Sequence, residues 1–131
     1  MRRLLLDTHA LLWWLAGNQQ LGAKAQSIIA DPRNDVFVSA ASSWEIAIKQ
    51  NIGKLTAPKG LASIIDEEGF LPLPISLFHG EQAGYLPEHH KDLFDRMLIA
   101  QAQAEGLEIV TSDEKFEAYG VRLVEASSGR E

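Results

Sequence analysis

The sequence contains no cysteine. Disulfides are therefore excluded, as are zinc and iron–sulfur sites that bind through thiolates, and the composition fits a reducing cytosol. Long apolar runs are also missing. The run at residues 4–6 is broken by Asp7 and His9, and no stretch approaches the roughly 20 apolar residues that span a bilayer. We therefore expect a cytoplasmic protein that has no signal peptide and makes no membrane contact.

Positive charge is in short supply. The chain has 12 Lys and Arg residues against 18 Asp and Glu residues, which gives a net charge of −6. A domain that coats nucleic acid through a broad basic face is usually positive, so that mode of binding is disfavoured. The same charge balance does not argue against an enzyme whose acids gather in a metal site. With 131 residues, 46% of them hydrophobic, we expect a single domain spanning residues 1–131, with a frayed tail at 125–131.

Short apolar segments alternate with segments of helical periodicity along the chain. Strand patterns occur at residues 3–6, 36–38, 70–75, 107–111 and 121–124, and helical patterns at 8–16, 22–31, 41–52, 59–68, 77–85, 93–105 and 114–119. Pro72 and Pro74 favour an edge position for the third strand. The alternation predicts an α/β fold of three layers, α/β/α, with a central, mostly parallel sheet of about five strands.

Two acids directly follow expected strands. Asp7 comes after the strand at 3–6 and Asp113 after the strand at 107–111, and each precedes a helix whose free N–H groups it would cap. Capping and a functional role explain each acid equally well. The carboxyl ends of parallel strands meet at one edge of a sheet, where ligands bind. The topology therefore predicts that the two carboxylates lie near each other.

A third acid, Glu45, lies inside an expected helix. With Ser42 it fits the S-x-x-E capping box, which explains the glutamate in structural terms. It also shares a helix face with Ile48 and Ile52, an apolar stripe that a cap would not need. Taken alone, Glu45 is explained slightly better by capping than by function.

The fourth acid, Asp95, follows the expected N-cap Asp92 and shares its helix face with Leu98 and Ile99. The helix dipole favours an anion in this first turn, but an unpaired charge on a core-facing stripe is costly. Crowded carboxylates raise one another's pKa unless a cation neutralises them. Oxygen ligands without cysteine suit Mg²⁺ or Mn²⁺ better than zinc. The four acids therefore predict a metal site that acts on a phosphodiester.

Four segments then suggest a family: LLLDTHALLWW, SAASSWEIAIKQNIGKL, HHKDLFDRMLIAQAQAEG and EIVTSDEKFEAYGV. In this order they resemble the PIN-domain ribonucleases, specifically the VapC-type toxins, and the similarity covers essentially the whole chain. One departure is Leu93, where the family often has proline, which affects loop geometry alone. The resemblance implies that one or two Mg²⁺ or Mn²⁺ ions are bound by Asp7, Glu45, Asp95 and Asp113. It further implies secondary contacts from three hydroxyls, those of Thr8, Thr111 and Ser112.

By the same resemblance, the activity is metal-dependent hydrolysis of RNA, and the protein is the toxin of a toxin–antitoxin pair. Asp7 and Asp95 are expected as primary ligands, with Glu45 holding the ion through water or orienting the attacking water, and Asp113 completing the cluster. A cognate antitoxin would lay a helix into a groove near Trp13 and Trp14. The early helices would form a homodimer.

Cationic, imidazole and other aromatic side chains are the remaining polar candidates. Lys49 follows Glu45 by one helical turn and serves either a salt bridge or a substrate phosphate, and Arg96 adjoins Asp95 as a second possible phosphate contact. Trp44 is expected in the core or at an interface. No metal-type spacing links the four histidines, which are expected at the surface: His9, His79, His89 and His90.

Three other assignments remain open. The segment LLLDTH resembles the start of the haloacid dehalogenase nucleophile motif, but that chemistry needs a second Asp where this chain has His9. A response-regulator receiver domain needs an acid pair before its first helix and a late lysine, which are not in place. The third is an inactive PIN-like module that only binds RNA or protein, and the presence of all four acids argues against it.

Overall fold

The computed structural model describes residues 1–128, which form a five-stranded sheet in the order β3-β2-β1-β4-β5. Every neighbouring pair is parallel. The strands are β1 (Arg3–Leu6), β2 (Asp35–Ser39), β3 (Leu71–Leu73), β4 (Glu108–Thr111) and β5 (Leu123–Glu125). The expected sheet is confirmed, and β3 with Pro72 occupies one edge, the position that proline favours in a sheet.

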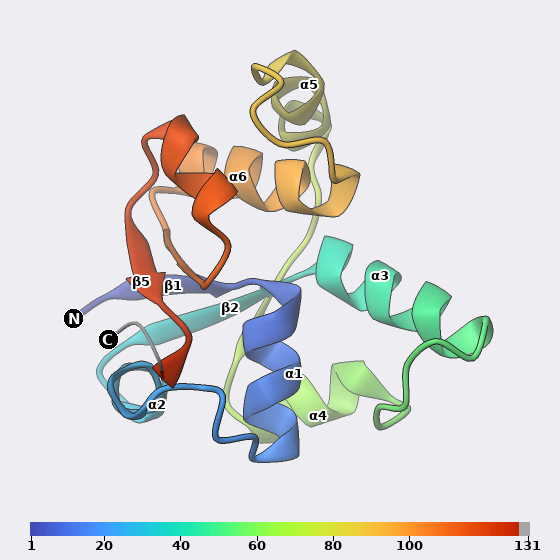
Figure 1. The fold of residues 1–131 in the computed structure, drawn as a ribbon, viewed down its shortest axis with the longest axis vertical. Helices are drawn as coiled ribbons and strands as arrows, with labels where there is room; N and C mark the ends of the chain where they lie inside the picture. Colours follow the sequence, from blue (N-terminus) through green and yellow to red (C-terminus); the bar gives the residue numbers. More distant parts are fainter. Residues whose placement is uncertain (129–131) are drawn as a thin grey trace.

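The connections between the strands are largely helical. They are α1 (Thr8–Ala16), α2 (Ala23–Ala30), α3 (Ala40–Asn51), α4 (Leu61–Glu67), α5 (Leu77–Tyr85), α6 (Leu93–Glu105) and the 3₁₀ helix η1 (Glu114–Tyr119). Figure 1 shows α1, α2 and α4 on one side of the sheet and α6 on the other. The three-layer α/β/α architecture is therefore confirmed. Within residues 1–128, no helix combines the length and apolar character needed to cross a bilayer.

The central strand β1 explains why the sheet is covered on both faces. Leu4 and Leu6 belong to the apolar cluster that includes α1 and α2, whereas Leu5 belongs to the cluster that includes Leu98 and Ile99 of α6. All three leucines of β1 are fully buried. A strand with both faces buried has no polar alternation, which is why this segment is continuously apolar.

The prediction of a frayed tail is wrong for residues 125–128. Glu125 ends β5, Ala126 is buried and Ser127 forms a bridge with Leu21. Backbone hydrogen bonds hold the segment in place, because Ala126 N donates to the carbonyl of Thr111 and the carbonyl of Ala126 accepts from Gly22 N. The rest of the expected tail, residues 129–131, lies outside the described part of the chain.

Candidate metal centre

The two strand-end acids lie side by side because β1 and β4 are neighbours in the sheet. Asp7 N donates to the carbonyl of Val110 at 3.1 Å, and Asp113 follows the end of β4 by two residues. The two side chains are close enough for the charge of Asp113 to raise the pKa of Asp7. The prediction that the strand ends bring these acids together is confirmed.

Asp7 is both a helix cap and a buried acid. It is the N-cap of α1, where its Oδ1 accepts from Ala10 N at 2.8 Å, and its side chain also accepts from Thr111. Only 5% of the residue is exposed, and burial raises the pKa of its carboxyl group. Capping alone therefore does not explain why this acid is buried, since a residue that only caps a helix can lie at the protein surface.

Glu45 is held inside the same edge of the molecule, and the expected capping box is wrong. Ser39 caps α3 by accepting from Ala41 N, so Glu45 lies in the second turn and is buried. Its Oε1 accepts from the hydroxyl of Thr8 at 2.8 Å, and its Oε2 lies 2.7 Å from Nζ of Lys49. Of the two roles predicted for Lys49, the salt bridge is therefore formed.

Asp95 and Asp113 meet through a residue that the sequence analysis assigned to the surface. Nε2 of His90 lies 3.0 Å from Oδ2 of Asp95 and 3.0 Å from Oδ2 of Asp113. These three atoms lie within 4.8 Å of one another, the spacing of donors around one cation. The expectation that His90 lies at the surface is wrong. The loop before α6 places the residue against η1, and only 5% of it is exposed.

The other three histidines differ in their exposure to solvent. His79 is buried as well, with Nε2 2.9 Å from Oε2 of Glu105, so its surface assignment is also wrong. His9 and His89 are exposed, as expected. In the sequence, the only sign that distinguished His90 from His89 was its position two residues before the N-cap Asp92, which sets it at the start of the acidic turn of α6.

The electrostatics of Asp95 show how crowded the site is. Asp95 lies in the first turn of α6, where Asp92 caps the helix by accepting from Asp95 N at 3.0 Å. Burial, followed by the charges of Asp92, Asp7, Glu45 and Asp113, raises the pKa of Asp95 to about 8. Carboxylates from four segments thus act on one point, and their oxygens fit a hard divalent cation.

This crowding predicts an unusual pH dependence. Because the pKa of Asp95 is raised from 3.8 to about 8, the folded state binds more protons than the unfolded state between these values. Its contribution to stability is therefore complete below about pH 4 and is lost as the pH rises through about 8. With EDTA present, we expect the free energy of unfolding to fall by about 2 kcal/mol over this range, a value reduced for solvent screening.

Urea denaturation at a series of pH values measures this effect, with Asp95→Asn as the matched variant that cannot titrate. The difference between the two proteins isolates Asp95 from other titrating groups. A difference that stays constant with pH, or grows in favour of the wild type toward pH 8, contradicts the prediction.

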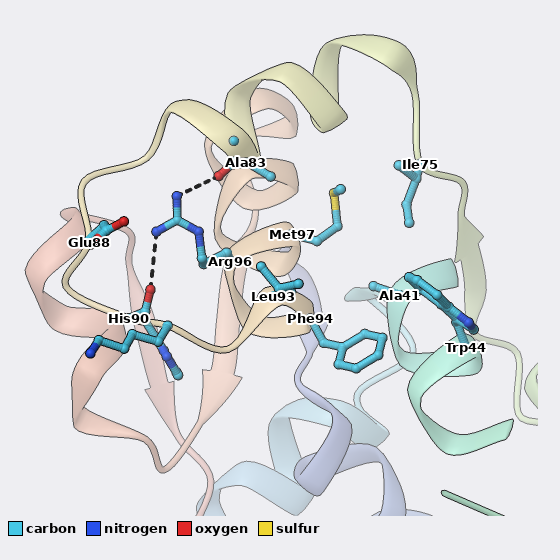
Figure 2. A pocket seen from close by; sticks show the side chains of 12 residues that line it. Ala41, Trp44, Ile75, Ala83, Glu88, His90, Leu93, Phe94, Arg96 and Met97 are labelled. Atoms are coloured by element: carbon cyan, nitrogen blue, oxygen red, sulfur yellow. Dashed lines mark hydrogen bonds between the residues drawn. The ribbon is translucent and has the colours of Figure 1, made fainter. Parts of the chain in front are cut away.

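Arg96 is buried and bonded to backbone carbonyls, which argues against its prediction as a phosphate contact. It is 8% exposed, and its guanidinium points toward the backbone of Ala83 and His90, at the two ends of the loop region between α5 and α6 (Figure 2). Four backbone carbonyls accept its N–H groups at 2.8–3.2 Å, those of Ala83, Leu86, Pro87 and His90. Two of these carbonyls lie at the carboxyl end of α5, where orphan carbonyls and the helix dipole favour a cation.

The hydroxyl residues at the site are already hydrogen-bonded to it. The hydroxyl of Thr8 lies 3.0 Å from that of Ser42 and also donates to Glu45. The hydroxyl of Thr111 accepts from Asp113 N at 3.0 Å. Ser112 is half-buried between Thr111 and Asp113. Their predicted nearness to the acids is borne out for Thr8 and Thr111 by these bonds.

An apolar cavity of about 690 Å³ opens next to the site. Figure 2 shows Trp44 and Ile75 on one side of it, Leu93 and Met97 near its middle, and His90 on the other side. Trp44 is 63% exposed, which differs from a core position. Trp13 and Trp14 are both half-buried, and Nε1 of Trp14 donates to Glu68 at 2.6 Å.

Comparison with known families decides the identity of the fold. The family model described as PIN domain matches residues 4–121. The chain belongs to the PIN-domain family. At the position where haloacid dehalogenase chemistry requires a second Asp, this chain has His9, which is exposed.

Individual relatives of this PIN domain are more distant. Ribonuclease VapC16 of Mycobacterium tuberculosis is 38% identical over 60 residues, a match that covers only 43% of this chain and 43% of that protein. The DNA-bound VapBC structure from Salmonella typhimurium aligns with a TM-score of 0.69 at 19% identity, covering 95% of this chain and 98% of that one. A toxin–antitoxin complex from Klebsiella pneumoniae aligns with a TM-score of 0.64 at 24% identity, over 92% and 95% of the chains. These structures support the fold.

Proposed function

We propose that the protein is a ribonuclease that hydrolyses RNA phosphodiester bonds with Mg²⁺ or Mn²⁺, and that it is the toxin of a toxin–antitoxin pair. The observation that carries the proposal is the convergence of Asp7, Glu45, Asp95 and Asp113 at the carboxyl edge of β1 and β4. It is supported by membership of the PIN-domain family and by the similarity of part of the chain to a named ribonuclease.

We assign different roles to the four acids. Asp7 and Asp95 would hold the cation, Asp113 would complete the cluster, and Glu45 would orient the attacking water. A bound divalent cation supplies charge neutralisation at the phosphate and lowers the pKa of a water molecule. The hydroxyl of Thr8 fixes the carboxylate of Glu45 at 2.8 Å, so that this base is already oriented before substrate binds.

Positive charge near the acids would guide the phosphates. Lys49 pairs with Glu45 but leaves 43% of its side chain exposed, so it can contact a phosphate without leaving the site. Ser112 and Thr111 would act as secondary contacts at the end of β4. Arg96 is not part of this surface, since its N–H groups are committed to the α5–α6 loop.

Protein partners follow from the same assignment. We propose that a cognate antitoxin binds the protein and that two copies associate as a homodimer. Helix α3 exposes an apolar row at one-turn spacing, formed by Trp44, Ile48 and Ile52, which suits burial against another chain. The similar structure from Klebsiella pneumoniae is described as a toxin–antitoxin complex, and that from Salmonella typhimurium as DNA-bound VapBC.

Incubation of the purified protein with RNA tests the enzymatic part. We expect strand cleavage with Mn²⁺ or Mg²⁺ and a loss of at least about 10³-fold in rate with EDTA, since the cation contributes several kcal/mol to the transition state. Restoring an excess of Mn²⁺ should restore cleavage, which controls for damage by the chelator. Cleavage that proceeds equally in EDTA would contradict a metal-dependent mechanism.

A further inference from the structure

His90 lies in the loop between α5 and α6 and contacts both Asp95 and Asp113 through the same nitrogen atom. Resting on the proposed function, we propose that His90 is a positioning residue. Its Nε2–H donates to Asp113, and the same nitrogen lies 3.0 Å from Oδ2 of Asp95, so that the ring holds the two carboxylates together for the cation. The imidazole itself is not a metal ligand. The two acids come from α6 and from the segment after β4, so the histidine joins two segments that are neighbours in the fold but separate in the sequence.

The hydrogen bond at the other ring nitrogen decides between donor and ligand. The backbone N–H of Asp92 donates to Nδ1 of His90 at 3.3 Å. An N–H group donates only to a nitrogen that has a free lone pair, so Nδ1 is unprotonated and the neutral ring carries its hydrogen on Nε2. A protonated Nε2 cannot bind a cation, although its distance from both carboxylates would allow it. It can only donate to them.

The ring is held in this orientation from several directions. The backbone N–H of His90 donates to the hydroxyl of Tyr119 at 2.8 Å, and that hydroxyl donates to the carbonyl of Pro87 at 2.6 Å. Arg96 donates to the carbonyl of His90 at 3.2 Å. The ring meets Phe116 edge-on, with centroids 5.7 Å apart. The donor is therefore aimed by contacts with both α6 and η1.

The consequence concerns the energy of assembling the site. When Asp95 is ionised, it and Asp113 are like charges, and 36% of the Asp113 side chain is exposed, so repulsion would otherwise turn Asp113 toward solvent. A shared donor keeps one oxygen of each carboxylate in place while lone pairs remain for the cation. The free energy of metal binding is then not reduced by the cost of bringing the two acids together. Hydrogen bonds to the ligands of a metal raise its affinity in this way.

Two substitutions separate the donor from the ring. His90→Gln retains an amide N–H near the position of Nε2, whereas His90→Phe keeps the packing on Phe116 and donates nothing. By titration calorimetry with Mn²⁺, we expect His90→Phe to bind about 10–100-fold more weakly than the wild type. We expect His90→Gln to recover most of this loss. His89→Phe, at the exposed neighbouring residue, is the matched control and should bind as the wild type does.

A second measurement does not depend on the variants. Nitrogen-15 NMR of the metal-free and Mg²⁺-loaded wild type should show the His90 ring protonated at Nε2 and unprotonated at Nδ1 in both. A nitrogen coupling from His90 to Mn²⁺ in pulsed EPR would overturn the proposal, because the ring would then be a ligand. Equal Mn²⁺ affinity of His90→Phe and the wild type would also overturn it.

The failure of this proposal differs from failure of the proposed function. Wild-type protein that neither takes up Mn²⁺ nor cleaves RNA overturns the metal-dependent ribonuclease and the positioning role with it. Wild-type protein that does both, with variants that bind Mn²⁺ equally well, overturns the positioning role alone. Thermal unfolding of each variant confirms that the comparison is made between folded proteins. If His90→Phe does not fold, the ring tautomer and the EPR coupling of the wild type still decide the question.

Discussion

Asp95→Asn is expected to lower metal-dependent RNA cleavage by about 10³-fold or more, equivalent to about 4 kcal/mol of transition-state stabilisation. The substitution removes the negative charge that would bind the cation but keeps the shape of the side chain. Its amide oxygen can still accept from Nε2 of His90, which lies 3.0 Å from Oδ2 in the wild type. The loss should therefore come from the missing charge, with the loop before α6 in place.

The same variant should be more stable than the wild type when metal is absent. At pH 8 the wild type holds Asp95 among Asp7, Glu45, Asp92 and Asp113, whose charges raise its pKa. A neutral side chain relieves this repulsion, so activity and stability should move in opposite directions. A residue with a purely structural role would lose both together.

Asp92→Asn is the matched control for this experiment. It removes the same charge three residues earlier in the same turn, at an exposed position, and asparagine caps a helix as well as aspartate does. We expect its cleavage rate to stay within about threefold of the wild type, since Asp92 is not one of the four proposed ligands and its charge affects the site only through the pKa of Asp95. Equal losses in the two variants, or Asp95→Asn protein that retains a tenth of the cleavage rate, would remove Asp95 from the site.

Arg96→Met should destabilise the protein by about 3–5 kcal/mol. The substitution fills a similar space with an apolar chain but leaves four carbonyls without the donors they have in the wild type. Unsatisfied buried acceptors carry the full cost of their lost hydration, which exceeds the net value of a hydrogen bond. The carboxyl end of α5 also loses the cation that complements its dipole.

Urea denaturation measures this effect, with Arg122→Met as the control. Arg122 is exposed, and its substitution should change the free energy of unfolding by less than about 0.5 kcal/mol. Equal stability of the two variants would show that the carbonyls find other donors. Because Arg96 also donates to the carbonyl of His90, the variant should bind Mn²⁺ less tightly wherever it remains folded.

Local patterns predicted the elements of the fold well. Three expected helices, at 8–16, 77–85 and 93–105, have the bounds of α1, α5 and α6, and the apolar segment at 3–6 is β1. These elements begin and end at residues with strong local preferences. Asp7, Ser76 and Asp92 cap them, and Gly17 and Gly106 end two of them with positive φ angles. The tail was misjudged because its hydrogen bonds run to residues 20–22 and 111, far away in the sequence.

The convergence of the four acids was predictable from the sequence, and the contacts that hold them were less so. Two acids lie at strand ends, and parallel topology alone brings such positions together. Arg96 and His90 were misjudged in opposite ways, one as a substrate contact and the other as a surface residue. Each is buried by the loop between α5 and α6, a segment whose path no periodicity describes.

The sequence by itself determined which segments are strands and helices, that the sheet is parallel, and that its acids suit a hard cation, because these follow from short-range preferences and residue chemistry. Only the tertiary structure decided what each charged side chain contacts. His90 between Asp95 and Asp113, and Arg96 on the end of α5, depend on segments that are distant along the chain. A side chain's partner is set by the packing of the whole domain, which local sequence does not encode.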